Sequence, residues 1–146
     1  MAKKLTPGDA KSLATFCGRL AKDKKATAVT LLKIKDIEGS PAEWFVIAEC
    51  MTEPQVRSMA DEVLRQTKNV GLDAPRSEGW DSMNWVILDY FDVVVHIMKK
   101  EARLFYKLER LWGDAEMYTI SDAGRLVKAR GDREDGSLLN AEDTGV

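Results

Sequence analysis

The sequence is poor in the residues that build metal centres and disulfide frameworks. Its 146 residues include two cysteines and one histidine. One histidine excludes a histidine-rich metal site, and two cysteines are too few for a four-cysteine zinc site. Cys17 lies on the apolar face of an expected helix and Cys50 ends an expected strand, so buried free thiols are favoured over a disulfide. A Cys-His nucleophilic pair is not excluded by count, but neither cysteine lies in a recognisable motif.

Long hydrophobic runs are also missing. The longest, such as WVIL and VVV, fall far short of the roughly 20 residues that span a bilayer. The opening residues MAKKLTPGDAK lack the apolar segment of a secretory signal. We therefore expect a soluble, non-secreted, cytoplasmic protein with no membrane partner.

Neither sign of charge dominates, because 22 basic residues face 24 acidic ones and the net charge is -2. This balance argues against a protein that coats nucleic acid by bulk electrostatics and leaves only a local basic face for such contacts. We expect no sequence-specific nucleic-acid partner. Residues 116–146 are acidic, rich in glycine and poor in aromatics, so this tail is expected to be largely disordered.

The common catalytic motifs are absent from the sequence. No GxxxxGK[ST], GxGxxG, GxSxG or HExxH string occurs. His96 lies between hydrophobic residues, where a lone histidine is more often a satisfied core residue than a catalytic base. Asp89 and Asp92 bracket an expected turn, where acids more often cap backbone amides than act as paired carboxylates. Nothing in the sequence requires an enzyme, a cofactor or a metal.

The hydrophobic pattern predicts one α/β domain over residues 1–115. Thr6 is the expected N-cap of a first helix that ends near Lys25, and a Thr52–Gln55 capping box begins a second helix. Strands are expected at 27–34, 44–50, 84–90 and 92–98, the last two as a tight hairpin, and a third helix from about Lys99 to Trp112. This order predicts a mixed β-sheet packed by about three helices.

The third predicted helix has an apolar stripe that is expected to face the sheet. The stripe occupies an arc of roughly 120° and contains Leu104, Phe105, Leu108, Leu111 and Trp112. Tyr106 falls on the opposite side among lysines and arginines, a composition enriched at binding hot spots. The alternative is that Tyr106 only covers the helix surface. Glu109 lies at the border of the stripe, able to pair with Arg110 or with an incoming cation.

The predicted hairpin is apolar on both faces of its strands, with Trp85 and Ile87 alternating with Val86 and Leu88. A strand that is buried on both sides needs two covering layers. Three helices can supply both layers. If they cover one face only, Trp85 and its neighbours are left for a partner.

Several segments together resemble the ribosomal silencing factor family, also called the Iojap family. They are ADEV (60–63), EG (78–79), NWVILDYFDVVVHIM (84–98) and EARLFYKLERLWGDA (101–115). The last two are the most specific, close to the family's W-[VI]-x-[LV]-D-[YL]-G-D-V-[VI]-V-H-[VI] and R-x-x-Y-x-L-E-x-L-W. WFVIAECMTEPQVRSMADEV also looks like the family's F-V-I-A-T-G-T-S-x-x-Q-V-x-x-[IM]-A-D-x-[VL]. The resemblance covers about residues 9 to 115.

The sequence departs from the family pattern at two places. The family's A-T-G-T-S is Ala48-Glu49-Cys50-Met51-Thr52 here, without the glycine, although Thr52 still serves as a helix cap. Phe91 stands where the family has its hairpin glycine. Because phenylalanine tolerates a positive φ poorly, we expect either a different turn or an exposed Phe91.

The resemblance implies a fold similar to that of nucleotidyltransferases, without their catalytic Gly-Ser turn and paired strand carboxylates. It implies a non-enzymatic factor that binds the large ribosomal subunit. The family docks on the fourteenth universal large-subunit ribosomal protein, at the face that meets the small subunit, and so blocks subunit joining and lowers translation when nutrients run short. Organelle relatives act in large-subunit assembly.

The resemblance also implies which residues contact the ribosomal protein. Trp85 is the expected apolar anchor, and Tyr90 and Met98 are expected to extend the apolar patch. Arg103 and Tyr106 are expected to complete the rim of the interface.

Acidic residues are the second part of this implied contact. Asp89, Asp92 and Glu109 are expected to pair with basic groups on the ribosomal protein. His96 and Trp112 also match the motif and are expected to be mainly structural.

Two other functions compete with this interpretation. One is a nucleotidyltransferase-like enzyme that uses Asp89 and Asp92 with a metal, although a single turn between them disfavours a two-metal geometry. The other is a homodimeric scaffold in which the hairpin face packs on a second copy.

Overall fold

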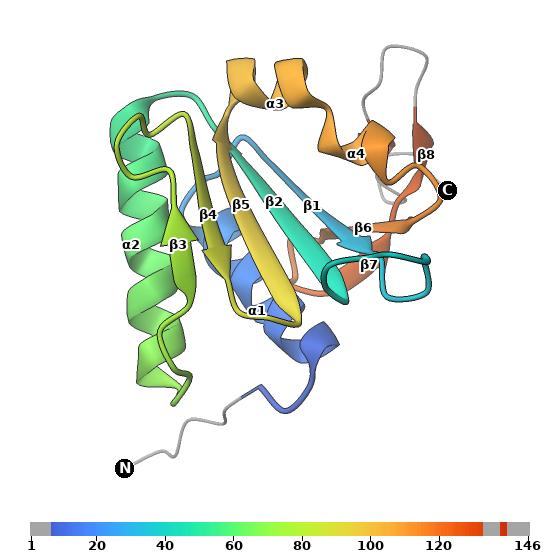
Figure 1. Cartoon of the computed structure of the whole chain (residues 1–146), viewed down its shortest axis with the longest axis horizontal. Helices are drawn as coiled ribbons and strands as arrows, with labels where there is room; N and C mark the ends of the chain where they lie inside the picture. Colours follow the sequence, from blue (N-terminus) through green and yellow to red (C-terminus); the bar gives the residue numbers. More distant parts are fainter. Residues whose placement is uncertain (1–6, 133–137, 140–146) are drawn as a thin grey trace.

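The protein is an α/β domain built on one large mixed sheet (Figure 1). The computed structural model describes residues 7–132, 138 and 139. The helices are α1 (Ala10–Asp23), α2 (Glu53–Asn69), α3 (Lys100–Tyr106) and α4 (Leu108–Leu111). The strands are β1 (Ala28–Lys33), β2 (Trp44–Cys50), β3 (Arg76–Glu78), β4 (Trp85–Asp89), β5 (Val93–Lys99), β6 (Glu116–Ile120), β7 (Leu126–Lys128), β8 (Arg130–Asp132) and β9 (Leu138–Leu139).

The main sheet has seven strands in the order β3-β4-β5-β2-β1-β6-β7, and β8 pairs with β9 separately. β2 and β5 are parallel, and the other neighbouring strands of the main sheet are antiparallel. The connection between the parallel strands β2 and β5 contains α2, β3 and β4, since parallel neighbours need a long crossover rather than a tight turn. The predicted hairpin is confirmed, because β4 and β5 pair with Trp85 opposite Met98. Because the sheet contains both parallel and antiparallel pairs of strands, the expected mixed sheet is also confirmed.

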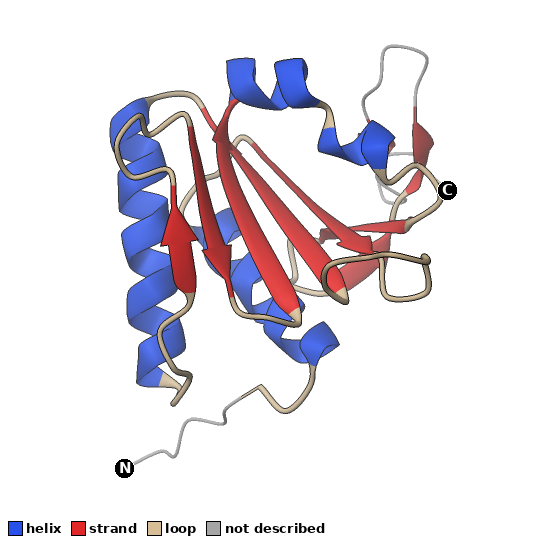
Figure 2. Cartoon of the chain, in the orientation of Figure 1, coloured by secondary structure: helices blue, strands red, loops and turns tan. Residues whose placement is uncertain are grey.

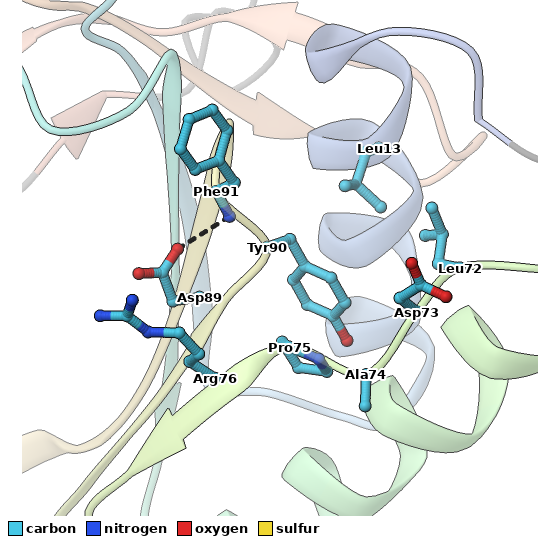
Figure 3. A pocket seen from close by; sticks show the side chains of 9 residues that line it. All are labelled: Leu13, Leu72, Asp73, Ala74, Pro75, Arg76, Asp89, Tyr90 and Phe91. Carbon is cyan, nitrogen blue, oxygen red and sulfur yellow. Dashed lines mark hydrogen bonds between the residues drawn. The ribbon is translucent and has the colours of Figure 1, made fainter.

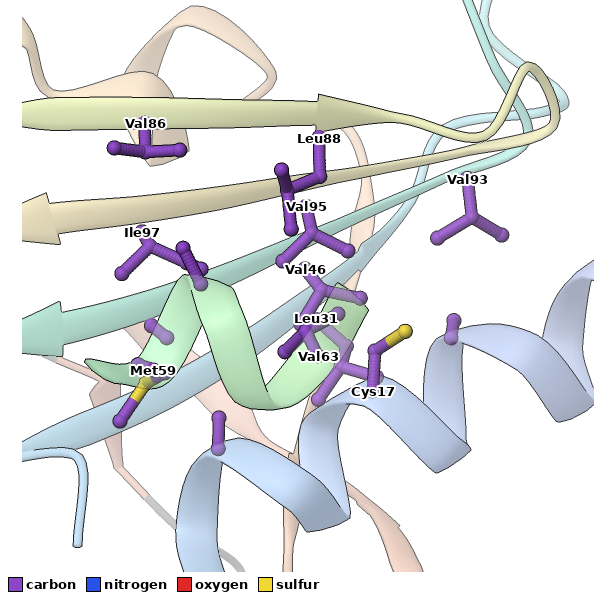
Figure 4. Packing of buried hydrophobic residues seen from close by; sticks show 14 of the residues in the cluster. Cys17, Leu31, Val46, Met59, Val63, Val86, Leu88, Val93, Val95 and Ile97 are labelled. Atoms are coloured by element: carbon purple, nitrogen blue, oxygen red, sulfur yellow. The ribbon is translucent and has the colours of Figure 1, made fainter. Parts of the chain in front are cut away.

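One face of the sheet is covered by α1 and α2, which pack over the buried residues that we call the helix-side cluster (Figures 2 and 4). Cys17 of α1, Met59 and Val63 of α2, and Val46 and Val95 of the central strands belong to it. Each strand sends alternate residues to this face, since successive side chains point to opposite sides. The result is a layer of two helices on a sheet.

The two cysteines are buried free thiols in this cluster, as predicted. The Cys50 thiol lies 3.8 Å from the Met59 sulfur. Burial raises the pKa of Cys17 to about 12 and, with the neighbouring Glu49 carboxylate, that of Cys50 to about 11. Neither thiol is therefore an activated nucleophile.

The helix starts follow side-chain capping. Thr52 and Gln55 form the predicted capping box at α2, with both reciprocal hydrogen bonds present. The cap of α1 is Asp9, whose carboxylate accepts the Ser12 amide at 2.7 Å. The prediction of Thr6 was wrong for this helix, because an acid three residues later offers a stronger acceptor to the first turn. Thr6 itself lies outside the described residues.

Residues 116–128 correct the prediction of a disordered tail. β6 pairs with β1 and β7 pairs with β6, so this segment extends the main sheet. Ile120 is buried and packs close to α1, where a Cβ on Gly18 would come within 3.1 Å of its side chain. The average composition of residues 116–146 did not predict these strands. A short strand needs few apolar residues once a neighbouring strand supplies its hydrogen bonds. The predicted tail at 133–137 and 140–146 lies outside the described residues.

The third predicted helix is broken at Lys107, which has φ 50° and ψ 55° in the left-handed region. The residues before and after it therefore do not share one helical wheel, and the predicted sheet-facing stripe holds for Leu108 and Trp112 only. Leu108 is buried and Trp112 half-buried, but the remaining stripe residues are exposed at 59% for Leu104, 77% for Phe105 and 72% for Leu111.

Candidate interaction surface

The second face of the sheet is covered by a short segment rather than by a full helical layer. Its buried residues form what we call the open-face cluster, which consists of Leu32, Ile34, Phe45, Ile47, Val94, Met98, Leu108 and Met117. The α3–α4 segment contributes Leu108 to this cluster and packs Ala102 and Trp112 against it. Figures 1 and 2 show this segment away from α1 and α2. The helices thus leave part of the second face, including half-buried Trp85, available to a partner.

Three aromatic side chains stand in contact along this part of the surface. The rings of Trp85 and Tyr106 have centroids 4.7 Å apart, and those of Tyr106 and Phe105 are 4.9 Å apart. We call these three residues the aromatic row. Phe105 is exposed at 77% and Tyr106 at 53%. Contiguous exposed aromatic area of this kind is typical of protein–protein contacts.

The sequence prediction placed only part of this surface correctly. Tyr106 is exposed beside Trp85, in agreement with its predicted outer position. Phe105, Leu104 and Leu111 were assigned to the core and are instead exposed. Helical periodicity could not reveal them, because Lys107 adopts a left-handed conformation in the structure and the residues on its two sides do not share one continuous stripe.

Trp85 is fixed in place by His96 of the neighbouring strand. The Trp85 indole Nε1–H donates to His96 Nδ1 at 3.0 Å. Burial lowers the pKa of His96 to about 4, and the weaker influence of the Asp89 carboxylate acts in the opposite direction. The imidazole is therefore neutral near pH 7 and carries its proton on Nε2.

His96 was predicted to be a buried core residue with its hydrogen bonds satisfied. The burial is confirmed, but one of its two ring nitrogens has no partner among the described residues. It is buried and its ring lies 4.5 Å from that of Phe45. Its Nε2 is buried without a hydrogen-bond partner among the described residues. The Trp85 hydrogen bond is therefore the one that satisfies this side chain within the described part of the chain, which makes Trp85 a structural residue as well as a surface one.

Met98 and Tyr90 do not extend the apolar patch, contrary to the prediction. Met98 is fully buried in the open-face cluster. Tyr90 packs against the helix-side cluster, and its hydroxyl lies 2.7 Å from that of Thr67 on α2. Burial raises the pKa of the Tyr90 phenol. The sheet separates Tyr90 from Trp85, because the two side chains lie on opposite faces.

Arg103 does not lie on an exposed rim, and Glu109 already has a basic partner within the chain. The side chains of both are almost buried, at 13% and 12% exposure, and pair with each other at 2.5 Å between Nε and Oε1. The sequence offered Arg110 or an incoming cation as partners of Glu109, and the structure shows Arg103 as its partner within the chain. Helical spacing could not predict this pair, because the two residues come together only across the break at Lys107.

Asp89 caps a backbone amide of the β4–β5 turn with its carboxylate, as the commoner interpretation of turn acids predicts, whereas Asp92 contributes its backbone carbonyl. The Asp89 carboxylate accepts the Phe91 amide at 2.8 Å, and the Asp92 carbonyl accepts the amides of Glu43 and Trp44. Phe91 keeps a positive φ of 77° and is 82% exposed, so the predicted exposure is confirmed. Within the described residues, no group of three or more histidine, cysteine or acidic side chains is arranged to hold a metal ion.

A cavity of about 370 Å³ lies beside this turn (Figure 3). It is lined by Leu13, Leu72, Asp73, Ala74, Pro75, Arg76, Asp89, Tyr90 and Phe91. The cavity is at the end of β4, whereas Trp85 begins that strand. The turn and the aromatic row are thus separate surfaces, one at each end of the hairpin.

Comparison with known proteins identifies relatives along most of the chain. A family model described as "Ribosomal silencing factor during starvation" matches residues 7–143. The chain is 41% identical over 93 residues to the ribosomal silencing factor RsfS of Halalkalibacterium halodurans, covering 64% of this chain and 79% of the relative. It is 36% identical over 109 residues to RsfS of Bacillus subtilis, covering 73% and 90%. The chloroplastic protein Iojap of Arabidopsis thaliana is 33% identical over 117 residues, which span 73% of this chain and 45% of that protein.

Solved structures share the fold. A Chromobacterium violaceum protein superimposes with a TM-score of 0.69 at 24% identity, over 93% of this chain and 98% of that chain. A Bacillus halodurans protein superimposes with a TM-score of 0.58 at 35% identity, over 70% and 91%. In the part of this chain that the structure describes, no helix is both long and apolar enough to cross a membrane.

Proposed function

Because this chain belongs to the ribosomal silencing factor family, we propose that it binds the large ribosomal subunit and sterically blocks subunit joining. The proposed contact is the fourteenth universal large-subunit ribosomal protein, at the face that meets the small subunit. The outcome is repression of translation. A role in large-subunit assembly would use the same contact.

The aromatic row is the observation that carries this proposal. Exposing Phe105 and Tyr106 beside Trp85 leaves apolar area in water, which costs free energy unless a partner covers it. Aromatic residues at the centre of a contact supply most of the binding energy in many interfaces. The mechanism requires no chemistry, since a domain of this size excludes the small subunit wherever it occupies the joining surface.

Charge around the aromatic row fits a particle made largely of RNA. Lys100, Lys107 and Arg110 are exposed on the α3–α4 segment. Basic side chains beside an apolar contact attract polyanionic RNA, and this attraction weakens as salt is added. Of the acids predicted for the contact, exposed Asp92 and half-buried Asp89 lie at the distant β4–β5 turn, so the proposed contact does not include them.

Binding to purified large subunits tests this proposal. Co-sedimentation of the wild-type protein is compared with that of Phe105→Ala and Tyr106→Ala. Phe91→Ala is the matched control, because Phe91 is an aromatic residue at the other end of the hairpin, 82% exposed against 77% for Phe105. We prefer Phe105 and Tyr106 to Trp85 for this test, since truncating Trp85 also removes the hydrogen bond to His96.

We expect the wild type and Phe91→Ala to co-sediment alike and the two row variants to bind at least about tenfold more weakly. In a subunit-joining assay, the wild type and Phe91→Ala should block joining alike, and the two row variants should block it less. Absence of wild-type binding to large subunits from its own organism would refute the proposal. Mass measurement against concentration detects a homodimer, and loss of that dimer in Phe105→Ala would place its interface on the row, where it competes with the ribosome for the same side chains.

A further inference from the structure

Helix α3, which carries Phe105 and Tyr106 of the aromatic row, has little apolar contact with the sheet. α3 has seven residues, all described by the structure, and none of them is buried. Its apolar side chains Leu104 and Phe105 point to solvent. A seven-residue helix without a buried apolar stripe is not stable by itself in water. Besides the packing of Ala102 on the open-face cluster and of Tyr106 on Trp85, a further interaction is therefore needed to hold α3 in place.

Arg103 supplies this interaction. Its Nε donates to Glu109 of α4 at 2.5 Å, its Nη1 to Glu49 of β2 at 3.4 Å, and its Nη2 to Thr30 of β1 at 2.8 Å. Three nitrogens of one guanidinium thus reach three different elements. The planar fork of arginine suits such a divided contact, whereas a lysine ammonium would concentrate its donors at one point.

The break at Lys107 is what brings Glu109 to Arg103. The two residues are six positions apart, which on a continuous helix would place their side chains about 120° apart around the axis. Lys107 in the left-handed region turns the chain so that Glu109 returns to the guanidinium. Tyr106, the last residue of α3, is then held against Trp85 with a centroid distance of 4.7 Å.

We infer that Arg103 is the positioning residue of the interaction surface. By joining α3 to β1, β2 and α4, it fixes Tyr106 against Trp85, and Phe105 against Tyr106, before the partner arrives. Such preorganisation removes part of the ordering cost of binding. The inference rests on the proposed function for the identity of the partner, but the attachment of α3 can be measured without it.

Hydrogen exchange tests the attachment, with Arg103→Lys as the central variant. This change keeps the positive charge and removes the fork. Arg57→Lys on α2 is the matched control, because Arg57 is exposed and its guanidinium lies over the Trp80 ring rather than on α3. In Arg103→Lys, amide exchange across residues 100–112 should accelerate by at least about tenfold while α2 keeps its protection. If Arg103→Lys does not fold, Thr30→Val, which removes one of the three contacts, takes its place.

Binding to large subunits supplies the second readout. Arg103→Lys should weaken binding by at least about tenfold at a temperature where the variant is folded. Combined with Phe105→Ala, it should weaken binding by clearly less than the product of the two single effects, because both act through the aromatic row. If Arg103 only stabilised the fold, the double variant would lose binding by the full product of the two single effects.

The outcomes separate this inference from the proposed function. Unchanged exchange in residues 100–112, or full binding by a variant whose α3 exchanges rapidly, would overturn the positioning role. If the wild type does not bind large subunits, the proposed function fails and the exchange measurement still decides whether Arg103 holds α3.

Discussion

Protonation of His96 should make the stability of this protein depend on pH in a defined window. Burial lowers the pKa of His96 from 6.5 to about 4 in the folded state. The unfolded chain therefore binds a proton more readily than the folded one between these two values. It follows that the free energy of unfolding is full above pH 6.5 and falls as the pH drops toward 4.

The magnitude follows from the size of the pKa difference. The full difference corresponds to about 3 kcal/mol, and the part lost between pH 7 and pH 5 is about 2 kcal/mol. His96 is 5% exposed, so solvent screening reduces this value little. The sequence contains one histidine, so no second imidazole contributes to the change.

Urea denaturation at pH 7 and pH 5 measures the fall in the free energy of unfolding. The variant His96→Asn shows how much of that fall is due to His96. The asparagine amide offers an oxygen to the Trp85 indole and does not titrate. We expect the wild type to lose about 2 kcal/mol more than His96→Asn between the two pH values. The absolute stability of the variant does not matter, because only the two pH dependences are compared. Equal pH dependence in both proteins would show that the buried neutral imidazole is not the cause.

Two further predictions address the C-terminal strands and the thiols. Ile120→Ala should destabilise the protein by about 2–4 kcal/mol, because Ile120 is buried against α1. Exposed Leu111→Ala should change stability by less than about 0.5 kcal/mol, and equal thermal shifts in the two variants would contradict the assignment of β6 to the core sheet. Cys17 and Cys50 should resist a thiol reagent at pH 8 in the native protein and both react in denaturant, because burial raises their pKa values to about 12 and about 11. Rapid labelling of either thiol in the native state would disagree with the buried positions.

Local patterns were sufficient for the elements whose stability is decided nearby. The predicted strand at 44–50 matches β2, and Thr52 with Gln55 correctly marked the start of α2. These signals work because capping and strand alternation involve residues a few positions apart. The resemblance to the ribosomal silencing factor family also came from short motifs, and the family is confirmed by the match over residues 7–143.

The candidate surface was less predictable, since it depends on contacts between distant parts of the chain. Arg103 looked like a solvent-exposed cation until Glu49 and Thr30, from two different strands, were placed beside it. Met98 and Tyr90 looked like neighbours of Trp85, but burial and the alternation of strand faces remove both from its surface. The predicted contact therefore becomes the row of Trp85, Tyr106 and Phe105.

The sequence by itself determined the α/β class, the hairpin, the capped α2 and the family. Only the tertiary structure decided which apolar residues are core and which are surface. Leu104 and Leu108 are both apolar and four positions apart, yet one is exposed and the other buried. The reason is the left-handed turn at Lys107, which forms where Arg103 can bind Glu109 and the sheet at the same time. Hydrophobicity is a property of a single residue, whereas burial depends on where the rest of the chain places it.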